Sequence, residues 1–163
     1  MAMVENTAPQ SEPKSDYLDL LQLVERLHRQ LLDVVKDELD REGMDNLNSV
    51  QALLLFNIGD QELTAGELRT RGHYLGSNVS YNLKKLVEAG YIRHERSESD
   101  RRSVRVSLTE SGHAVRSHLN TLFARQGNAL APVGGVDVEQ LPMVNTALTR
   151  VERFWSDHIR FRM

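Results

Sequence analysis

The sequence predicts a mainly α-helical protein with one small β-hairpin, folded as a single domain. Over most of the 163 residues, apolar side chains recur at steps of three and four, the period of an amphipathic helix. Between Tyr91 and Leu108 a period of two replaces it, which is typical of strands. A chain of this length falls in the usual range for one domain.

The N-terminal third begins with a polar stretch and continues as a long helix. Residues 1–15 contain proline and acidic side chains but no apolar run, which predicts a disordered tail and not a secretion signal. From Asp16 to about Arg41, one helical stripe of apolar residues predicts a helix that Gly43 ends. The stripe consists of Leu20, Val24, Leu27, Leu31 and Val35.

Two shorter helices follow. Asn48 can cap a helix that runs to Gly59. Thr64 is followed three residues later by Glu67, a spacing that predicts a capping box at the start of a third helix ending near Gly72.

A fourth helix is expected from Ser77, as its N-cap, to Gly90, where glycine favours a helix end. Its apolar residues fall within an arc of about 100°. The opposite face is polar, aromatic or charged: Ser77, Asn78, Tyr81, Lys84, Lys85 and Glu88. The alternating stretches "YIRHER" and "SVRVSL", joined by a polar turn, then predict a two-stranded antiparallel hairpin.

The C-terminal part is again helical. Thr109 can cap a fifth helix, which the stretch "QGNALAPVGG", beginning at Gln126, is expected to break. The last helix accommodates Pro142 in its first turn. Its apolar stripe is Leu141, Val144, Leu148, Val151 and Trp155.

Composition excludes several classes of function. Without cysteine, the chain has no disulfide, thiolate metal site or cysteine nucleophile, and the absence fits a cytoplasmic protein. The chain contains no run of eighteen apolar residues, so the sequence predicts no membrane-spanning helix. His113 and His118 are five residues apart and share a helix face poorly, so we expect no metal site and no cofactor. Because no catalytic constellation is visible, the protein is not expected to be an enzyme.

The distribution of charge indicates a polyanionic partner. The chain has a formal net charge of -3, but its first 45 residues contain eleven acidic residues against five basic ones. Residues 69–105 contain nine basic residues against four acidic ones. One basic segment in an acidic chain can attract a polyanion while the remainder suppresses non-specific contacts.

The order helix, short turn, helix, hairpin within this basic segment is that of a helix-turn-helix followed by a wing. The second helix of such a unit lies in the DNA major groove. Asn78 can pair with adenine, and Tyr81 can pack on a sugar or a thymine methyl group. The hydroxyl groups of Ser77 and Ser80 can bond to base or phosphate, and Lys84 and Lys85 can reach phosphates. Each residue taken singly could also belong to an ordinary solvated helix face.

Residues 63–112 resemble the winged helix-turn-helix of the MarR family of bacterial transcription regulators. The most specific match is "DRRSVRVSLTESG", which follows that family's wing signature. Its spacing from the preceding stretch "KKLVEAGYI" also resembles the family. The resemblance covers roughly residues 16–161. It implies an N-terminal dimerisation helix in residues 16–47, the DNA-binding region in 48–109, and helices completing the dimerisation layer in 110–163.

The resemblance also implies a role for the wing. Arg102 would enter a minor groove, braced by Asp100, and Arg96 and Arg101 would contact neighbouring phosphates. The alternative is that Asp100 and Arg102 only stabilise the turn as an exposed ion pair.

We expect a homodimer, since the first and last helices carry more apolar surface than a small winged domain covers. Two heads on a two-fold axis would bind a palindromic operator in double-stranded DNA, with half-sites roughly 10 bp apart. The resemblance implies a repressor that a small aromatic or phenolic effector releases from DNA. Candidate effector-binding residues are Tyr17, His28, Phe56, His113 and Trp155, although core or interface packing is the more common role for each of these side chains.

The alternative function is a winged-helix module for protein–protein assembly without a DNA target. Such a module has no need of Asn78, Lys84, Lys85 and Arg102 on one side, so the charge distribution favours the DNA-binding hypothesis.

Overall fold

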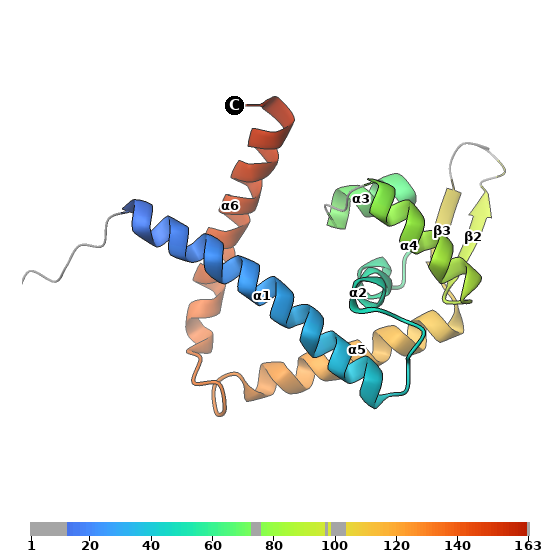
Figure 1. Ribbon diagram of the computed structural model, residues 1–163, viewed down its shortest axis with the longest axis horizontal. Helices are drawn as coiled ribbons and strands as arrows, with labels where there is room; N and C mark the ends of the chain where they lie inside the picture. Colours follow the sequence, from blue (N-terminus) through green and yellow to red (C-terminus); the bar gives the residue numbers. More distant parts are fainter. Residues whose placement is uncertain (1–12, 73–75, 97, 99–103, 163) are drawn as a thin grey trace, which may run out of the picture. The chain divides into compact units, whose positions relative to one another are not determined.

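The computed structural model describes residues 13–72, 76–96, 98 and 104–162, and it confirms a mainly α-helical fold with a small antiparallel sheet. The chain divides into two compact units, Met1–Leu119 and Asn120–Met163, with the division inside the fifth helix. The elements in chain order are α1 (Pro13–Arg41), α2 (Ser49–Ile58), β1 (Leu63–Thr64), α3 (Ala65–Gly72), α4 (Gly76–Glu88), β2 (Ile92–Arg96), β3 (Val104–Leu108), α5 (Glu110–Ala129), the 3-10 helix η1 (Val138–Gln140) and α6 (Leu141–Phe161) (Figure 1).

The helix α1 begins at Pro13, three residues before the predicted start at Asp16. Proline suits the first turn of a helix, where its missing N–H group has no intrahelical partner to lose. The tail predicted for residues 1–15 is therefore wrong for its last three residues, and residues 1–12 lie outside the described chain.

Two predicted helix starts are confirmed by their hydrogen bonds. At α2, the Asn48 side chain accepts from the backbone N–H of Gln51 at 2.8 Å, and the Gln51 side chain accepts from the Asn48 N–H at 3.1 Å. At α3, Thr64 and Glu67 form the predicted capping box, with both bonds at 3.1 Å. These boxes satisfy N–H groups that a helix start otherwise leaves without partners.

The C-terminal end of α4 agrees with the prediction, but its N-terminal end does not. Gly90 has φ +82°, its N–H donates to Val87, and the N–H of Tyr91 donates to Leu86 at 2.9 Å. This is a Schellman motif, which glycine favours. At the other end the predicted N-cap is wrong: α4 begins at Gly76, so Ser77 has helical backbone instead of the extended backbone of a cap.

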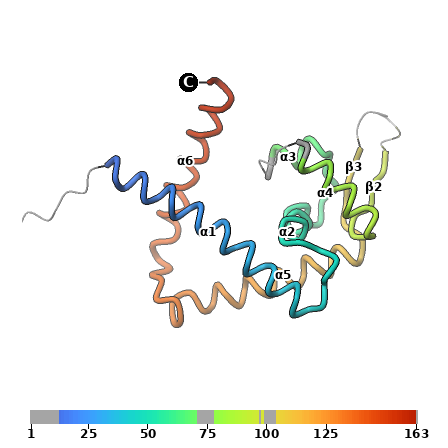
Figure 2. The backbone as a smooth tube through the Cα atoms, viewed as in Figure 1, coloured from blue at the N-terminus to red at the C-terminus, as the bar shows by residue number. Residues whose placement is uncertain are grey.

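The hairpin is part of a three-stranded sheet with the order β1-β3-β2. Its two long strands pair from Ile92 opposite Leu108 to Arg96 opposite Val104. On the other side of β3, Leu63 pairs with Val106. The sequence predicted only two strands, because β1 has two residues and is too short to show alternation. Figure 2 shows how the chain passes from α4 directly into this hairpin.

The start of α5 explains a glycine of the wing signature. Thr109 caps the helix as predicted: its hydroxyl accepts from the Gly112 N–H at 3.3 Å and donates to the Gly90 carbonyl at 2.6 Å. A Cβ atom at position 112 would lie 2.3 Å from the carbonyl oxygen of Tyr91. Only glycine therefore allows α5 to approach the end of α4 so closely.

The predicted break after α5 is confirmed: the helix ends at Ala129, inside the stretch that begins at Gln126, although it continues past Gly127. A single glycine costs a helix only about 1 kcal/mol relative to alanine, which the surrounding turns can offset. The chain leaves the helical path at the following segment, where Gly135 has φ +65°.

A compact core in the first unit holds α4 in a defined orientation. Leu68 of α3 and Ile92 of β2 are almost fully buried, together with Leu54, Leu55 and Ile58 of α2. The buried residues that α4 contributes to this core are Val79, Leu83 and Leu86. Because one side of α4 is committed to the core, its opposite side is exposed.

The long terminal helices contrast with this core. In α1 only Val35, Glu38 and Leu39 are buried, all near its C-terminal end. The second unit contains α6, in which no described residue is buried. No helix in the described ranges combines the length and hydropathy that crossing a membrane requires.

Candidate nucleic-acid interface

The outer face of α4 presents the side chains that the sequence predicted for DNA contact. Asn78, Ser80, Tyr81, Lys84 and Lys85 are all exposed on this helix. They alternate in helical register with the buried apolar residues, so they lie on the side away from the core. The backbone of Ser77 begins the same helix, but its side chain lies outside the described part of the structure.

Two side chains lie close to the Lys85 ammonium group. Its ammonium nitrogen lies 5.7 Å from the centre of the Tyr81 ring, one helical turn earlier. The same nitrogen lies 3.9 Å from a carboxylate oxygen of Glu88. The first distance is typical of a cation–π contact and the second of a loose ion pair.

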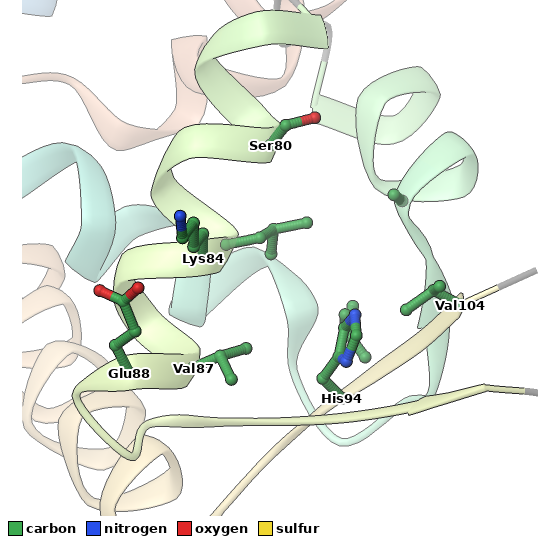
Figure 3. Close-up of a pocket in the computed structure, with 9 residues that line it drawn as sticks. Ser80, Lys84, Val87, Glu88, His94 and Val104 are labelled. Atoms are coloured by element: carbon green, nitrogen blue, oxygen red, sulfur yellow. The ribbon is translucent and has the colours of Figure 1, made fainter.

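A pocket of about 340 Å³ lies between α4 and the hairpin. Figure 3 shows Ser80, Lys84, Val87 and Glu88 along α4, and His94 and Val104 on the hairpin. Its lining residues are Ala65, Ser80, Leu83, Lys84, Val87, Glu88, His94, Val104 and Val106. The interior is apolar, and polar groups of three kinds stand around it: a hydroxyl, an imidazole and a pair of opposite charges.

The hairpin carries one described residue of the predicted wing contact. Arg96 is exposed at the end of β2, opposite Val104. The other predicted contacts, Asp100, Arg101 and Arg102, lie outside the described residues. On the other side of β3, where this strand pairs with β1, the Arg105 guanidinium lies 3.6 Å from the carboxylate of Glu62, the residue before β1.

One ion pair and two histidine–carboxylate contacts connect the start of α5 to the rest of the first unit. The Asp60 carboxylate lies 3.4 Å from the Arg116 guanidinium and 3.6 Å from the Nδ1 atom of His113. On the same helix, His118 Nδ1 lies 3.5 Å from Glu42, just beyond α1. These contacts are largely exposed and contribute little to stability individually.

The five candidate effector residues come from four different helices. Tyr17 and His28 are exposed on α1, and Phe56 is half-buried on α2. His113 is exposed on α5, and Trp155 is half-buried on α6, in the second unit. None of the five is among the residues that line the pocket between α4 and the hairpin.

Sequence reasoning missed the pocket residues of the hairpin, although a signal was present. In β2 the period of two places His94 on the same face as Ile92, which is buried. His94 also stands directly opposite the buried Val106 in the register of the sheet. The alternation in "YIRHER" therefore indicated that His94 shares the face of the core residues.

Comparisons with known proteins agree with this geometry. Residues 47–112 match a family model described as a winged helix DNA-binding domain. The chain is 35% identical over 145 residues to the exopolysaccharide II synthesis transcriptional activator ExpG of Rhizobium meliloti (strain 1021), covering 89% of this chain and 74% of ExpG.

Solved structures share the fold at lower identity. A mutant of MarR from E. coli complexed with operator DNA has a TM-score of 0.68 at 19% identity, covering 86% of this chain and 99% of that one. BpsR of Bordetella bronchiseptica, from a study of how 6-hydroxynicotinic acid regulates its DNA binding, has a TM-score of 0.67 at 16% identity, covering 82% and 98%. The wing signature, the three-stranded sheet behind α4 and the extended match to ExpG lead to one conclusion: the chain belongs to the MarR family of winged helix-turn-helix transcription regulators.

Proposed function

We propose that the protein is a homodimeric transcription regulator that binds a palindromic operator in double-stranded DNA and responds to a small aromatic effector. The observation that carries this proposal is the exposed polar face of α4, whose opposite face is anchored in the core. The protein would act in the cytoplasm, where a bacterial chromosome is accessible, and as a regulator and not an enzyme.

On DNA, α4 would lie in the major groove with Asn78 toward base edges and Lys84 and Lys85 toward phosphates. Arg96 would contact a phosphate of the DNA backbone next to the wing. Arg102 would enter the minor groove, held in place by Asp100. Ser77, Ser80 and Arg101 would add contacts to bases or phosphates. If each protomer contacts about four phosphates, the logarithm of affinity should fall with the logarithm of salt concentration with a slope of about -7.

Dimerisation is supported by apolar side chains that the single chain leaves exposed. On α1, Leu18, Leu27 and Leu31 are between 39% and 52% exposed. On α6, Val144, Leu148, Phe154 and Ile159 are exposed to a similar or greater degree. Exposed apolar side chains along amphipathic helices are suited to packing against helices of a second chain.

The pocket between α4 and the hairpin is the effector site that the described residues support best. Its volume fits a molecule of one aromatic ring, which its apolar lining would surround. The hydroxyl of Ser80 and the imidazole of His94 could bind a carboxylate or phenol on that ring. The regulation of BpsR by 6-hydroxynicotinic acid supports an effector of this class.

Effector binding can be tested with two matched histidine substitutions. Small aromatic carboxylates and phenols are screened for release of a fluorescent DNA fragment from the parent protein. For an active compound, His94→Ala should weaken the response while DNA binding persists, and His28→Ala on α1 should leave the response unchanged. The reverse pattern would locate the effector near α1 and remove the α4 pocket from the proposal.

The direction of regulation has two candidates. The family resemblance implied repression relieved by an effector, whereas the relative with 35% identity is named a transcriptional activator. We favour activation of at least one promoter on the strength of that relative. Expression of a reporter gene fused to a selected operator should rise when the protein is produced. A fall in reporter expression would favour repression instead.

The experiment that tests DNA recognition is selection of bound sequences from random DNA, followed by titration of the winner. We expect a palindromic motif and strongly salt-dependent binding. Binding that is independent of sequence and salt would favour the alternative, a winged-helix module for protein–protein assembly.

A further inference from the structure

The charge at the end of α4 has an arrangement that helix stability does not explain. Glu88 is the only acidic residue in Gly76–Glu88, and it is the last residue of the helix. A carboxylate at this position faces the negative end of the helix dipole, which is unfavourable. The order lysine then glutamate is also the weaker orientation for a helical ion pair. Glu88 therefore gains nothing from the helix dipole and little from its pairing with Lys85 as a helix-stabilising contact.

Glu88 lies in the same row of the helix as the predicted DNA contacts. Tyr81, Lys85 and Glu88 occupy positions i, i+4 and i+7, which fall on one face. The Lys85 ammonium lies 5.7 Å from the Tyr81 ring centre and 3.9 Å from a Glu88 carboxylate oxygen. All three side chains remain accessible: Tyr81 is 61% exposed, and the side chains of Lys85 and Glu88 are 49% and 54% exposed.

We propose that Glu88 holds Lys85 against Tyr81 and so weakens phosphate contact on DNA of any sequence. This rests on the proposed contact between α4 and DNA. A phosphate must compete with the Glu88 carboxylate for the same ammonium group, so Lys85 contributes less than a free lysine would. Because non-specific binding is almost wholly electrostatic, this weakening is measured most directly on random-sequence duplex.

The direct test is Glu88→Gln, which keeps the shape of the side chain and removes its charge. With random-sequence duplex at about 0.1 M salt, affinity should rise roughly three- to tenfold, the effect of about one additional phosphate contact. The log-log salt slope should steepen by about one for the same reason. Glu139→Gln, an exposed glutamate in η1 of the second unit, makes the same change of net charge and should alter neither quantity.

A double-mutant cycle with Lys85→Met separates restraint of the lysine from simple repulsion of DNA. If Glu88 acts through Lys85, Glu88→Gln should have no effect on the slope or on non-specific affinity in the Lys85→Met background. If the gain persists there undiminished, Glu88 acts on DNA directly and the proposal is wrong. An unchanged slope in the Glu88→Gln protein itself would also overturn it.

The role of Tyr81 in the restraint is tested by two substitutions. Tyr81→Phe keeps the ring and should preserve the parent's salt slope, whereas Tyr81→Ala should change it in the direction of a freed lysine. Operator binding by the parent distinguishes the two levels of failure. If the parent binds no DNA, the proposed function fails; if it binds and Glu88→Gln behaves as the parent, only the inference about Glu88 fails.

Discussion

Asn78 is an exposed amide near the start of α4, at the position where a reading helix enters the major groove. Asn78→Ala should relax base preference at one position in each half-site, at a cost of about 1–3 kcal/mol for the preferred base pair. Selection from random DNA measures this directly. Asn82→Ala is the matched control, because the Asn82 amide donates to the Asn78 backbone carbonyl at 2.9 Å. A motif identical to the parent's would remove Asn78 from base recognition.

Arg102 is expected to contribute to affinity through the minor groove. Arg102→Ala should weaken operator binding sharply, while the dimer and thermal unfolding stay nearly unchanged, since the family resemblance assigns Arg102 to groove contact and not to packing. Fluorescence titration and a thermal melt provide the two measurements. Arg29→Ala removes the same charge from α1 and should have little effect. Operator affinity equal to the parent's would exclude Arg102 from the interface.

At the residue scale, the sequence correctly predicted which side chains of a single helix are exposed. It did not predict which side chains from distant segments lie together. The period of α4 was enough to place Asn78, Tyr81 and Lys85 outside the core. The contact between Lys85 and Glu88 could not be derived from spacing alone, because many i,i+3 pairs never form. The pocket at His94 depends on the packing of the hairpin against α4, which sequence alternation only partly indicates.

At the element scale, the two glycines of α5 should respond to alanine in opposite ways. Gly112→Ala places a Cβ atom 2.3 Å from the Tyr91 carbonyl oxygen, so the junction of α4, hairpin and α5 must shift. We expect destabilisation of about 1–3 kcal/mol, as for other overpacked sites. At Gly127 no atom beyond its chain neighbours and the nearby backbone of its own helix lies within 4 Å of the added Cβ, so Gly127→Ala should stabilise by roughly 0.5–1 kcal/mol.

Urea unfolding of both variants measures these changes in the free energy of unfolding. If Gly112→Ala is as stable as the parent, the close approach of α5 to Tyr91 is not required by the fold. Loss of stability in Gly127→Ala would mean that the helix does not continue through this position.

Elements were predictable where local hydrogen bonds decide them. The capping box of Thr64 and Glu67 and the glycine at position 90 are short-range signals, and both are present in the structure. The strand β1 was missed because it exists only through its pairing with β3, a partner some forty residues later in the chain. The break after α5 was predictable because glycine and proline cluster in the segment that follows Ala129.

At the scale of the whole molecule, dimerisation should depend on the exposed stripe of α1. Leu27 is 52% exposed, and Leu27→Glu places a charge in the apolar stripe. We expect monomers and a large loss of operator affinity, because a single head has only half of the phosphate contacts. Gln22→Glu adds the same charge to the other side of α1 and should leave the dimer intact. Sedimentation shows which outcome holds, and a dimeric Leu27→Glu protein would move the interface elsewhere.

At this scale the sequence predicted only that the first and last helices, α1 and α6, are amphipathic. The stripes of α1 and α6 indicated surfaces in need of a partner, and the structure leaves much of both exposed. Which surfaces meet across a two-fold axis depends on a second chain, and no pattern within one chain determines it.

The most direct test of the central claim is the stoichiometry of the complex with a selected palindromic duplex, measured by sedimentation together with its dependence on half-site spacing. The account predicts two protomers on each duplex, with affinity that falls when the half-sites are moved by about five base pairs, since this turns one groove to the opposite side of the DNA. One protomer per duplex, or affinity that ignores the spacing, would contradict it.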